Sequence, residues 1–116
     1  MTDKELKELA EFAAEFLELE KTKDKRFPFN IDLGYGVMSI TIKDMLDDCW
    51  ISATVAYLAK RKMEEMGFEW VHSFNKLPGG KTIFICEVYT ATNDFPGTGD
   101  NEYIALWLAI REAVKG

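Results

Sequence analysis

The chain has 116 residues, of which 47% are hydrophobic and 29% charged, with a formal net charge of −6. This length and composition predict a single globular domain over residues 1–116 and exclude a disordered chain. The acidic balance disfavours nucleic acid as a direct partner, because phosphate backbones carry the same sign of charge.

The apolar runs and the cysteines predict the compartment. The apolar runs are shorter than the roughly 18 residues of a membrane span, and the charged first residues are unlike a secretory signal. Cys49 and Cys86 stand far apart in apolar surroundings, which is typical of a reducing compartment. The sequence therefore predicts a cytoplasmic protein that does not bind membranes.

The first forty residues predict one helix, a connector and one short strand. Apolar residues recur at helical spacing from Thr2 to about Glu20, which predicts an amphipathic helix. The charged residues 21–26 predict a solvated connector. Residues 27–36 include a proline and two glycines, which exclude a regular helix there. Alternation of apolar and polar residues over 37–42 predicts a short edge strand.

The centre of the chain predicts one long helix or two shorter ones. A capping box, with Thr41 followed three residues later by Asp44, predicts a helix start. The helical pattern runs over 43–66, where the following Gly67 stops it. A second arrangement fits the same residues, with 43–49 as a separate turn and a helix that begins at Ser52. The sequence leaves both arrangements open.

The strongest local pattern is a β-hairpin over residues 68–90. Apolar and polar residues alternate over 68–75 and over 81–90, and Pro-Gly-Gly at 78–80 favours a turn between them. The second strand is apolar on both faces at residues 83–86, which predicts that both faces are covered. We therefore expect helices on each side of this sheet.

The last part of the chain predicts a loop and a helix. Residues 91–99 are rich in Thr, Asn, Asp, Gly and Pro and predict the loop. Asp100 or Asn101 then caps a helix with one apolar stripe. The predicted order is α–(β)–α–β–β–α. The predicted fold class is α+β, with a small antiparallel sheet, including the central hairpin 68–90, sandwiched between helices.

Three segments together resemble the phage ABA sandwich domain family, over about residues 45–116. Ile51–Tyr57, continuing to Phe68, is similar to the family's helix with an alanine-rich start, an aromatic residue and a terminal glycine. Trp70–Tyr89 occupies the place of its hairpin, and Gly99-Asp100 followed by 105–113 is similar to its alanine-rich terminal helix. The chain lacks the family's Ser-Thr-Asp cap before the central helix and has Trp107 where a small residue is usual.

This resemblance implies a sheet packed between helix layers in a small phage or prophage protein. The location that it implies is the cytosol of the host cell. It implies no catalytic residues, because the family offers none that can be carried over to positions of this chain.

The residue chemistry predicts no catalytic centre, no metal and no cofactor. His72, beside Ser73 and Cys86, could orient a nucleophile, but a triad also needs a matched acid and an oxyanion hole, so a structural histidine is favoured. Structural zinc needs more ligands at closer spacing than Cys49, His72 and Cys86 provide. Residues 79–82, Gly-Gly-Lys-Thr, are similar to the end of a phosphate-binding loop, but a strand follows them, which favours a hairpin turn.

Two acidic segments are the candidate contact sites for a partner. On the first, three aspartates at i, i+3 and i+4 share one helix edge: Asp44, Asp47 and Asp48. With Asp32 they could hold Mg²⁺ or contact a basic partner, and solvated acids near a helix N-terminus are the alternative. The second is the loop 93–102, which places an aromatic residue among acids: Asp94, Phe95, Asp100 and Glu102. The basic triplet at 60–62 fans around a helix and predicts no nucleic-acid patch.

These observations favour a non-enzymatic protein that acts by contact with a host or phage protein. An acidic protein of this size could inhibit a host defence protein by occupying a basic groove. The alternative is a binding protein for a small, nucleotide-like ligand in an aromatic-lined pocket. A metal-dependent enzyme built on the three aspartates of the helix edge is a third hypothesis. A homodimer is compatible with the sequence.

Overall fold

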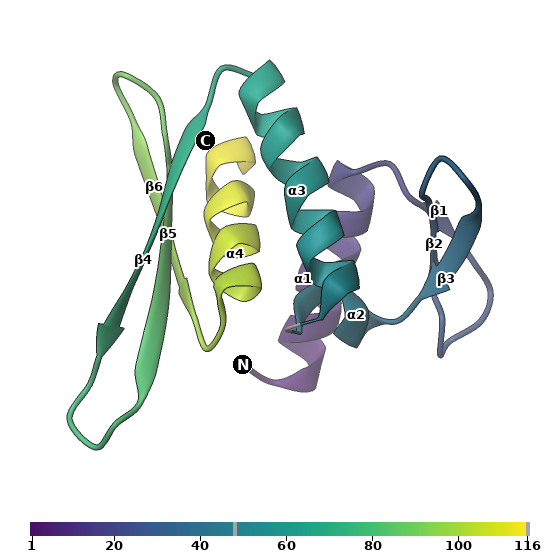
Figure 1. Ribbon diagram of the computed structural model, residues 1–116, viewed down its shortest axis with the longest axis horizontal. Coiled ribbons are helices and arrows are strands. Elements are labelled where there is room, and N and C mark those ends of the chain that lie inside the picture. Colours follow the sequence, from purple (N-terminus) through teal and green to yellow (C-terminus); the bar gives the residue numbers. More distant parts are fainter. Residues whose placement is uncertain (48, 116) are drawn as a thin grey trace.

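The computed structural model describes residues 1–47 and 49–115, and within them the chain forms four helices and two three-stranded antiparallel sheets (Figure 1). The α+β class is therefore confirmed. In chain order the elements are α1 (Asp3–Phe16), β1 (Glu20–Lys21), β2 (Phe29–Asp32), β3 (Val37–Ile40), α2 (Ile42–Leu46), α3 (Trp50–Glu65), β4 (Glu69–Lys76), β5 (Thr82–Tyr89), β6 (Asp94–Gly99) and α4 (Glu102–Lys115).

The helices lie between the two sheets, so the layering differs from the one predicted. In Figure 1 the β4–β5–β6 sheet forms one outer layer against α4, and the β1–β2–β3 sheet lies at the other side of the helices. No described helix covers the outer face of the β4–β5–β6 sheet, where Val71 is 49% exposed and Ile83 and Ile85 are half-buried. Ile85 lies between Ser73 and Thr98 on that face. Side chains of the flanking strands thus provide the partial burial that we expected from a second helix layer.

The predicted hairpin is confirmed. β4 and β5 pair in register from Glu69↔Tyr89 to Lys76↔Thr82. The turn is closed by a hydrogen bond from Leu77 N to Lys81 O, at 2.6 Å, and Gly79 and Gly80 adopt φ values of 93° and 87° that glycine tolerates without steric cost. The Gly-Gly-Lys-Thr segment is therefore a hairpin turn.

The predicted loop at 91–99 is wrong in its second half, because residues 94–99 form β6. This strand pairs with β5, with Gly97 opposite Cys86. Its loop-like composition has a packing reason: a Cβ atom at Gly97 would lie 2.5 Å from the backbone N of Ala109 on α4. Glycine at this position lets the backbone of β6 lie directly against the helix.

The first helix ends earlier than its apolar pattern predicts, and two short strands follow it. α1 begins with a capping box between Thr2 and Glu5 and has its C-cap at Leu17. Lys62 Nζ of α3 donates a hydrogen bond to the backbone O of Phe16, which binds one of the carbonyls that a helix end leaves unpaired. The predicted connector 21–26 is exposed apart from the half-buried Thr22, and only Lys21 of it belongs to a strand, β1. Residues 29–32 form β2, which β3 flanks as the predicted edge strand.

The central segment forms two helices rather than one. The predicted capping box is present: Asp44 N donates to Thr41 Oγ1 at 3.0 Å, and Thr41 N donates to Asp44 Oδ2 at 2.9 Å. α2 ends at Leu46 and α3 begins at Trp50, which is closer to the second of the two open arrangements. Ser52, fully buried in the first turn of α3, donates its hydroxyl hydrogen to the backbone O of Asp44 and holds the two helices together.

Trp107 lies at the centre of the core, between the helices. Its side chain is 0% exposed, and the rings of Phe12 and Phe16 meet its edge at centroid distances of 6.3 and 5.9 Å. These aromatic side chains therefore hold α1 against α4. None of the described helices combines the length and apolar character that crossing a membrane requires.

Candidate functional site

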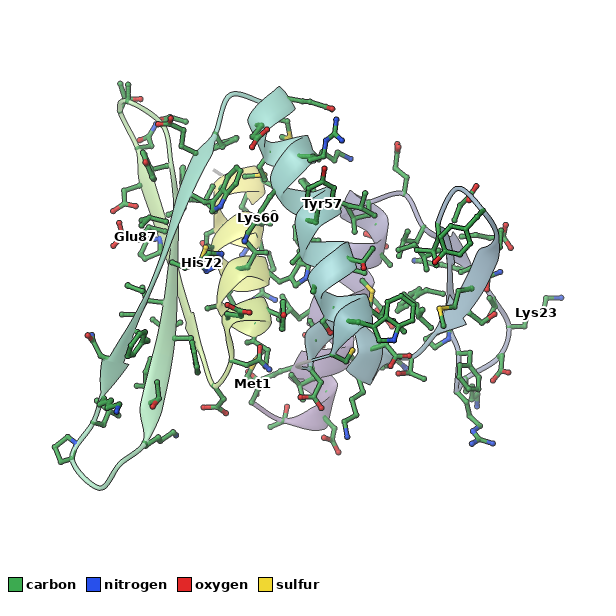
Figure 2. All side chains as sticks on the ribbon, viewed as in Figure 1. Met1, Lys23, Tyr57, Lys60, His72 and Glu87 are labelled. Carbon is green, nitrogen blue, oxygen red and sulfur yellow. The ribbon has the colours of Figure 1, made fainter. Side chains whose placement is uncertain are left out.

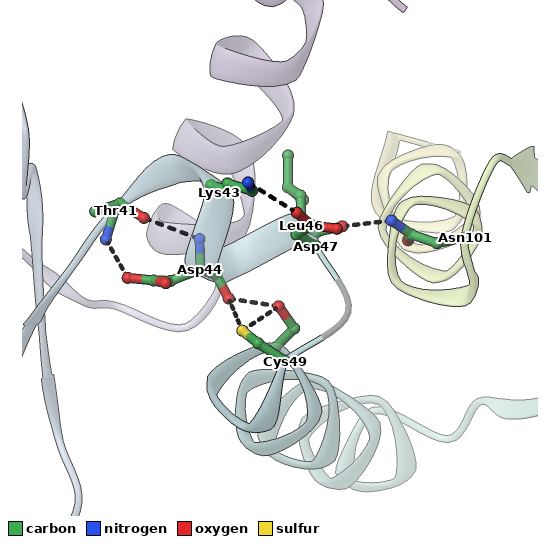
Figure 3. A network of polar contacts seen from close by, with 8 residues as sticks. Thr41, Lys43, Asp44, Leu46, Asp47, Cys49 and Asn101 are labelled. Atoms are coloured by element: carbon green, nitrogen blue, oxygen red, sulfur yellow. Dashed lines mark hydrogen bonds and ion pairs between the residues drawn. The ribbon is translucent and has the colours of Figure 1, made fainter.

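The predicted acidic helix edge is divided by the structure. Asp44 is half-buried and its carboxylate accepts the capping hydrogen bond, so this residue stabilises the start of α2 (Figure 3). Asp47, at the end of α2, is exposed, and its Oδ2 lies 3.6 Å from Lys43 Nζ. Asp48 lies outside the described residues.

Asn101 joins the end of α2 to the start of α4. Its Nδ2 donates to the backbone O of Leu46 at 2.8 Å (Figure 3). Its Oδ1 accepts from the backbone N of Tyr103 and of Ile104, at 3.0 and 2.9 Å. Of the two predicted caps, Asp100 and Asn101, Asn101 caps α4, and its side chain also binds the end of α2. The contact brings Asp47, the residue after Leu46, close to Asn101, and both line the same opening.

Asp94 and Phe95 do not belong to the same surface. They lie at the other end of β6, about 17–20 Å along the chain from Asp100 at the usual rise per residue of a strand. Phe95 is half-buried, and its ring packs edge-on against that of Phe68 at 6.3 Å. Asp100 itself lies 3.7 Å from Lys81 of the hairpin, Oδ1 to Nζ. The predicted contact loop is thus a strand with separate surroundings at its two ends.

An apolar cavity opens where α1, α2 and the start of α4 meet. Its volume is about 490 Å³. Four aliphatic side chains line it, and a ring of polar residues completes it: Leu6, Ile42, Leu46 and Ile104, with Asp3, Lys43, Asp47 and Asn101. We call this set the acid-rimmed cavity. Sequence reasoning missed its aliphatic residues, because their helical spacing predicts core rather than the wall of an opening.

A second, smaller site lies between α3, α4 and β4. It has a volume of about 200 Å³ and contains the single histidine, His72, with the polar groups of Tyr57, Lys60, Glu102 and Tyr103 around it. Figure 2 shows Lys60 and His72 side by side in the space between α3 and the sheet. Lys60 Nζ lies 5.9 Å from the centroid of the Trp70 ring, a cation–π distance. We call this set the His72 cleft.

The ionisation states in the His72 cleft oppose nucleophilic catalysis. Burial lowers the pKa of His72, the nearby Lys60 lowers it further, and Glu102 acts in the opposite direction. His72 Nδ1 is buried without a hydrogen-bond partner among the described residues. Cys86 is directly opposite His72 in the sheet, but burial raises the pKa of its thiol to about 12. A reactive cysteine needs a lowered pKa, so this pair is neutral at physiological pH. Ser73 projects from the opposite face of β4.

The remaining candidates from the sequence lie apart from one another. Asp32 lines a groove of about 660 Å³ between the β1–β2–β3 sheet and α3, whose lining does not include the α2 aspartates. Among residues 1–47 and 49–115, no three His, Cys, Asp or Glu side chains gather as a metal would require. The basic triplet diverges: Lys60 lies over Trp70, Arg61 over Tyr57, and Lys62 over Phe16. No shared basic surface results.

The chain was compared with protein-family models, with curated proteins and with solved structures, and none of the three comparisons finds a match. The relation to the phage ABA sandwich domain family thus stays a prediction from the sequence.

Proposed function

We propose that the protein acts by binding another protein through the acid-rimmed cavity. In this complex an apolar side chain of the partner fills the cavity, and basic groups of the partner lie beside Asp3 and Asp47. The observation that carries the proposal is an open space of about 490 Å³ with aliphatic walls and carboxylates at its rim. An apolar anchor within a polar rim is the usual organisation of a protein–protein contact.

Electrostatics favours a basic partner for this surface. The net charge of the chain is −6, and Asp3 and Asp47 place two carboxylates in the lining of the cavity. Among the described residues of the lining, Lys43 is the one cation, and it is paired with Asp47. A field of this sign increases the rate of encounter with a basic surface and repels acidic ones.

The shape and chemistry of the cavities disfavour the alternative, a nucleotide-like ligand. Such a ligand needs aromatic faces or backbone amides around it, whereas the walls of the acid-rimmed cavity are aliphatic. The aromatic residues Phe12, Phe16 and Trp107 pack against one another between α1 and α4. The His72 cleft has two tyrosines but only about 200 Å³, below the usual size of a small-molecule pocket.

In this proposal the protein is a non-enzymatic accessory protein, and it blocks a basic site on its partner by occupying it. The phage or prophage origin, and a host defence protein as the target, rest on the resemblance described above and on the acidic charge. The proposal needs no cofactor.

A pair of variants on α4 tests the proposal. Ile104→Arg places a cation in the wall of the cavity, whereas Val114→Arg makes the same change at an exposed position near the other end of the helix. Partners are captured with the parent protein from a cell lysate, identified, purified and titrated against both variants. We expect Ile104→Arg to weaken binding at least tenfold and Val114→Arg to leave it unchanged. Equal binding by the parent and Ile104→Arg, with Ile104→Arg folded, would refute the proposal.

A further inference from the structure

The two edges of the β4–β5–β6 sheet differ in their capacity to accept another strand. The strand order places β4 at one edge and β6 at the other. An edge strand has backbone N–H and C=O groups that point away from the sheet, and natural proteins usually protect such groups against pairing. The direction of these groups therefore decides which edge is open.

On β6 the outward position is closed by a proline. Thr90 N donates to Asn93 O at 2.8 Å, and the alternation of an antiparallel pair then directs the groups of Phe95 and Gly97 toward β5. Pro96 takes the outward position between them, and it has no N–H to donate. β6 is thus a protected edge.

On β4 the outward groups are available. The hydrogen bond from Leu77 N to Lys81 O directs alternate residues of β4, among them Ser73, toward β5. The groups of Trp70, His72, Phe74 and Lys76 then point outward, and no backbone hydrogen-bond partner for them occurs among the described residues. β4 has eight residues, whereas β1 and β3, the edges of the other sheet, have two and four.

β4 also lacks the side chains that usually block edge pairing. It has no proline, and its charged residues, Glu69 and Lys76, lie at its two ends. The strand exposes 49% of Val71 and 61% of Phe74, and Figure 1 shows that the hairpin extends beyond the start of α4. A long and partly apolar edge whose charged residues lie only at its ends is the kind of edge that associates.

We propose that β4 pairs in antiparallel orientation with β4 of a second copy of this chain, which forms one six-stranded sheet across a two-fold axis. The antiparallel orientation places the Glu69 end of each strand next to the Lys76 end of its copy, so the charges at the strand ends are complementary. A parallel orientation would place like charges together. A self-complementary strand is the simplest basis of a symmetric dimer.

The register follows from the direction of the backbone groups. When the two-fold axis passes through Ser73, all four outward residues of β4 form backbone hydrogen bonds with the copy. In this register His72 lies opposite Phe74 of the copy, and Trp70 lies opposite Lys76 of the copy. Ser73 then faces Ser73 of the copy in a non-hydrogen-bonded pair, where side chains are closest. The half-buried Ile83 and Ile85 lie on the same outer face, which becomes continuous between the two copies.

One row of the sheet provides a matched pair of variants. Ser73, Ile85 and Thr98 lie side by side on the outer face, so that Ser73 is at the β4 edge and Thr98 at the β6 edge. Both edge residues are exposed, and Lys at either position adds the same charge. Ser73→Lys places two ammonium groups face to face in the proposed dimer, whereas Thr98→Lys leaves them far from the interface.

The oligomeric state is measured by analytical ultracentrifugation from about 1 to about 500 µM, a range that detects dissociation constants typical of small interfaces. Circular dichroism confirms that each variant is folded. We expect a concentration-dependent dimer for the parent and for Thr98→Lys, and a dissociation constant raised at least tenfold for Ser73→Lys. A parent that stays monomeric throughout, or a Ser73→Lys variant that dimerises like Thr98→Lys, would overturn the proposal.

Hydrogen exchange of the parent tests the geometry independently of any variant. The amides of Trp70, His72 and Phe74 should exchange slowly at high protein concentration and rapidly after dilution. The amides of Val71, Ser73 and Asn75, which bond to β5, should be protected in both conditions. A dimer in which the first three amides exchange as rapidly as in the monomer would overturn the strand pairing.

Discussion

Replacement of Gly97 by alanine tests the close contact between β6 and α4. A Cβ atom at this position would lie 2.5 Å from the backbone N of Ala109 and 3.1 Å from its Cα. Ordinary contacts of a Cβ begin near 3.4 Å, and the backbone O of Ala105 would be closer still than the N of Ala109, so strand and helix must separate by about 0.9 Å or more. Because the obstructing atoms are backbone, rotation of a side chain cannot relieve the overlap.

The cost of this separation follows from the packing of α4. Trp107 and Ile110 on this helix are 0% exposed and fill the centre of the core, so a shift of the helix disturbs their contacts as well. Overpacked substitutions usually cost about 1–3 kcal/mol, and a backbone obstruction places Gly97→Ala at about 3 kcal/mol or more. For a domain of this size that corresponds to a fall in Tm of about 12 °C.

Two other glycines provide the matched comparisons. A Cβ at Gly99 would lie 2.7 Å from Cγ2 and 3.0 Å from Cβ of Ile104, and 3.2 Å from the backbone N of Ala105. These overlaps are smaller than those at Gly97, so we expect a smaller loss, of about 1–2 kcal/mol. A Cβ at Gly36 would meet no atom within 4 Å, so Gly36→Ala should be neutral or stabilise by up to about 1 kcal/mol. Thermal and urea unfolding followed by circular dichroism give the three values. If Gly97→Ala lies within about 0.5 kcal/mol of Gly36→Ala, the close approach of α4 to β6 is wrong.

Three further predictions concern single side chains. A thiol reagent should modify the half-buried Cys49 in the folded protein and reach Cys86 only after unfolding, because Cys86 is fully buried and burial raises its pKa to about 12; two fast-reacting thiols in the folded state would contradict this. Asp44→Ala removes the capping hydrogen bond to Thr41 N and should lower the free energy of unfolding by about 1 kcal/mol, whereas Asp47→Ala, at an exposed ion pair, should change it by less than about 0.5 kcal/mol; equal losses in urea unfolding would argue against the cap. The pKa of His72 in the folded protein is lowered from 6.5, so the unfolded chain binds a proton at higher pH than the folded protein does. The contribution of His72 to the free energy of unfolding is therefore complete above pH 6.5 and is lost as the pH falls through 6.5 toward the lower pKa of the folded state. His72→Gln should lack this part of the pH dependence, and an NMR titration that places the pKa of His72 above 6.5 would contradict the prediction.

The amino-acid sequence by itself determined the elements whose signals are local. The capping box of Thr41 and Asp44, the turn at 78–80 and the alternation of the two hairpin strands each depend on residues a few positions apart. The amphipathic pattern of α1 and the Asn101 cap of α4 are local in the same way. Such signals act through backbone geometry and hydrogen bonds between neighbouring residues, so these elements can be predicted without knowledge of the fold.

Tertiary packing decided the elements whose local signals oppose their structure. Residues 94–99 contain one proline and two glycines, and their composition predicts a loop, yet they form β6. The backbone of α4 lies so close to Gly97 that only a residue without a side chain fits there. The end of α1 is similar, since its apolar pattern continues past Phe16 while the helix stops. At β6 the close contact with α4 outweighs local preference, whereas at the end of α1 the chain leaves the helix at Glu18, whose φ is 58°.

The layering was also a tertiary outcome. The apolar residues at 83–86 show that β5 is shielded on both faces, but not whether helices or neighbouring strands provide the shielding. In the fold, α4 covers one face, and on the other face Ile83 and Ile85 are half-buried, with Ile85 between Ser73 of β4 and Thr98 of β6. The pattern of apolar side chains predicts which faces of a strand are buried, but it does not predict which element covers them.

The candidate site shows the same division. The sequence predicted two acidic contact segments from residue type alone: Asp44, Asp47 and Asp48, and Asp94, Phe95, Asp100 and Glu102. Of these residues, Asp47 lines the acid-rimmed cavity, and a contact role for any of them stays a prediction. The sequence could not identify the acid-rimmed cavity, whose walls come from Leu6, Ile42, Leu46 and Ile104 on three helices. Residue type is a property of the chain, whereas a cavity exists only where distant segments meet, and their meeting is decided by the packing of the whole core.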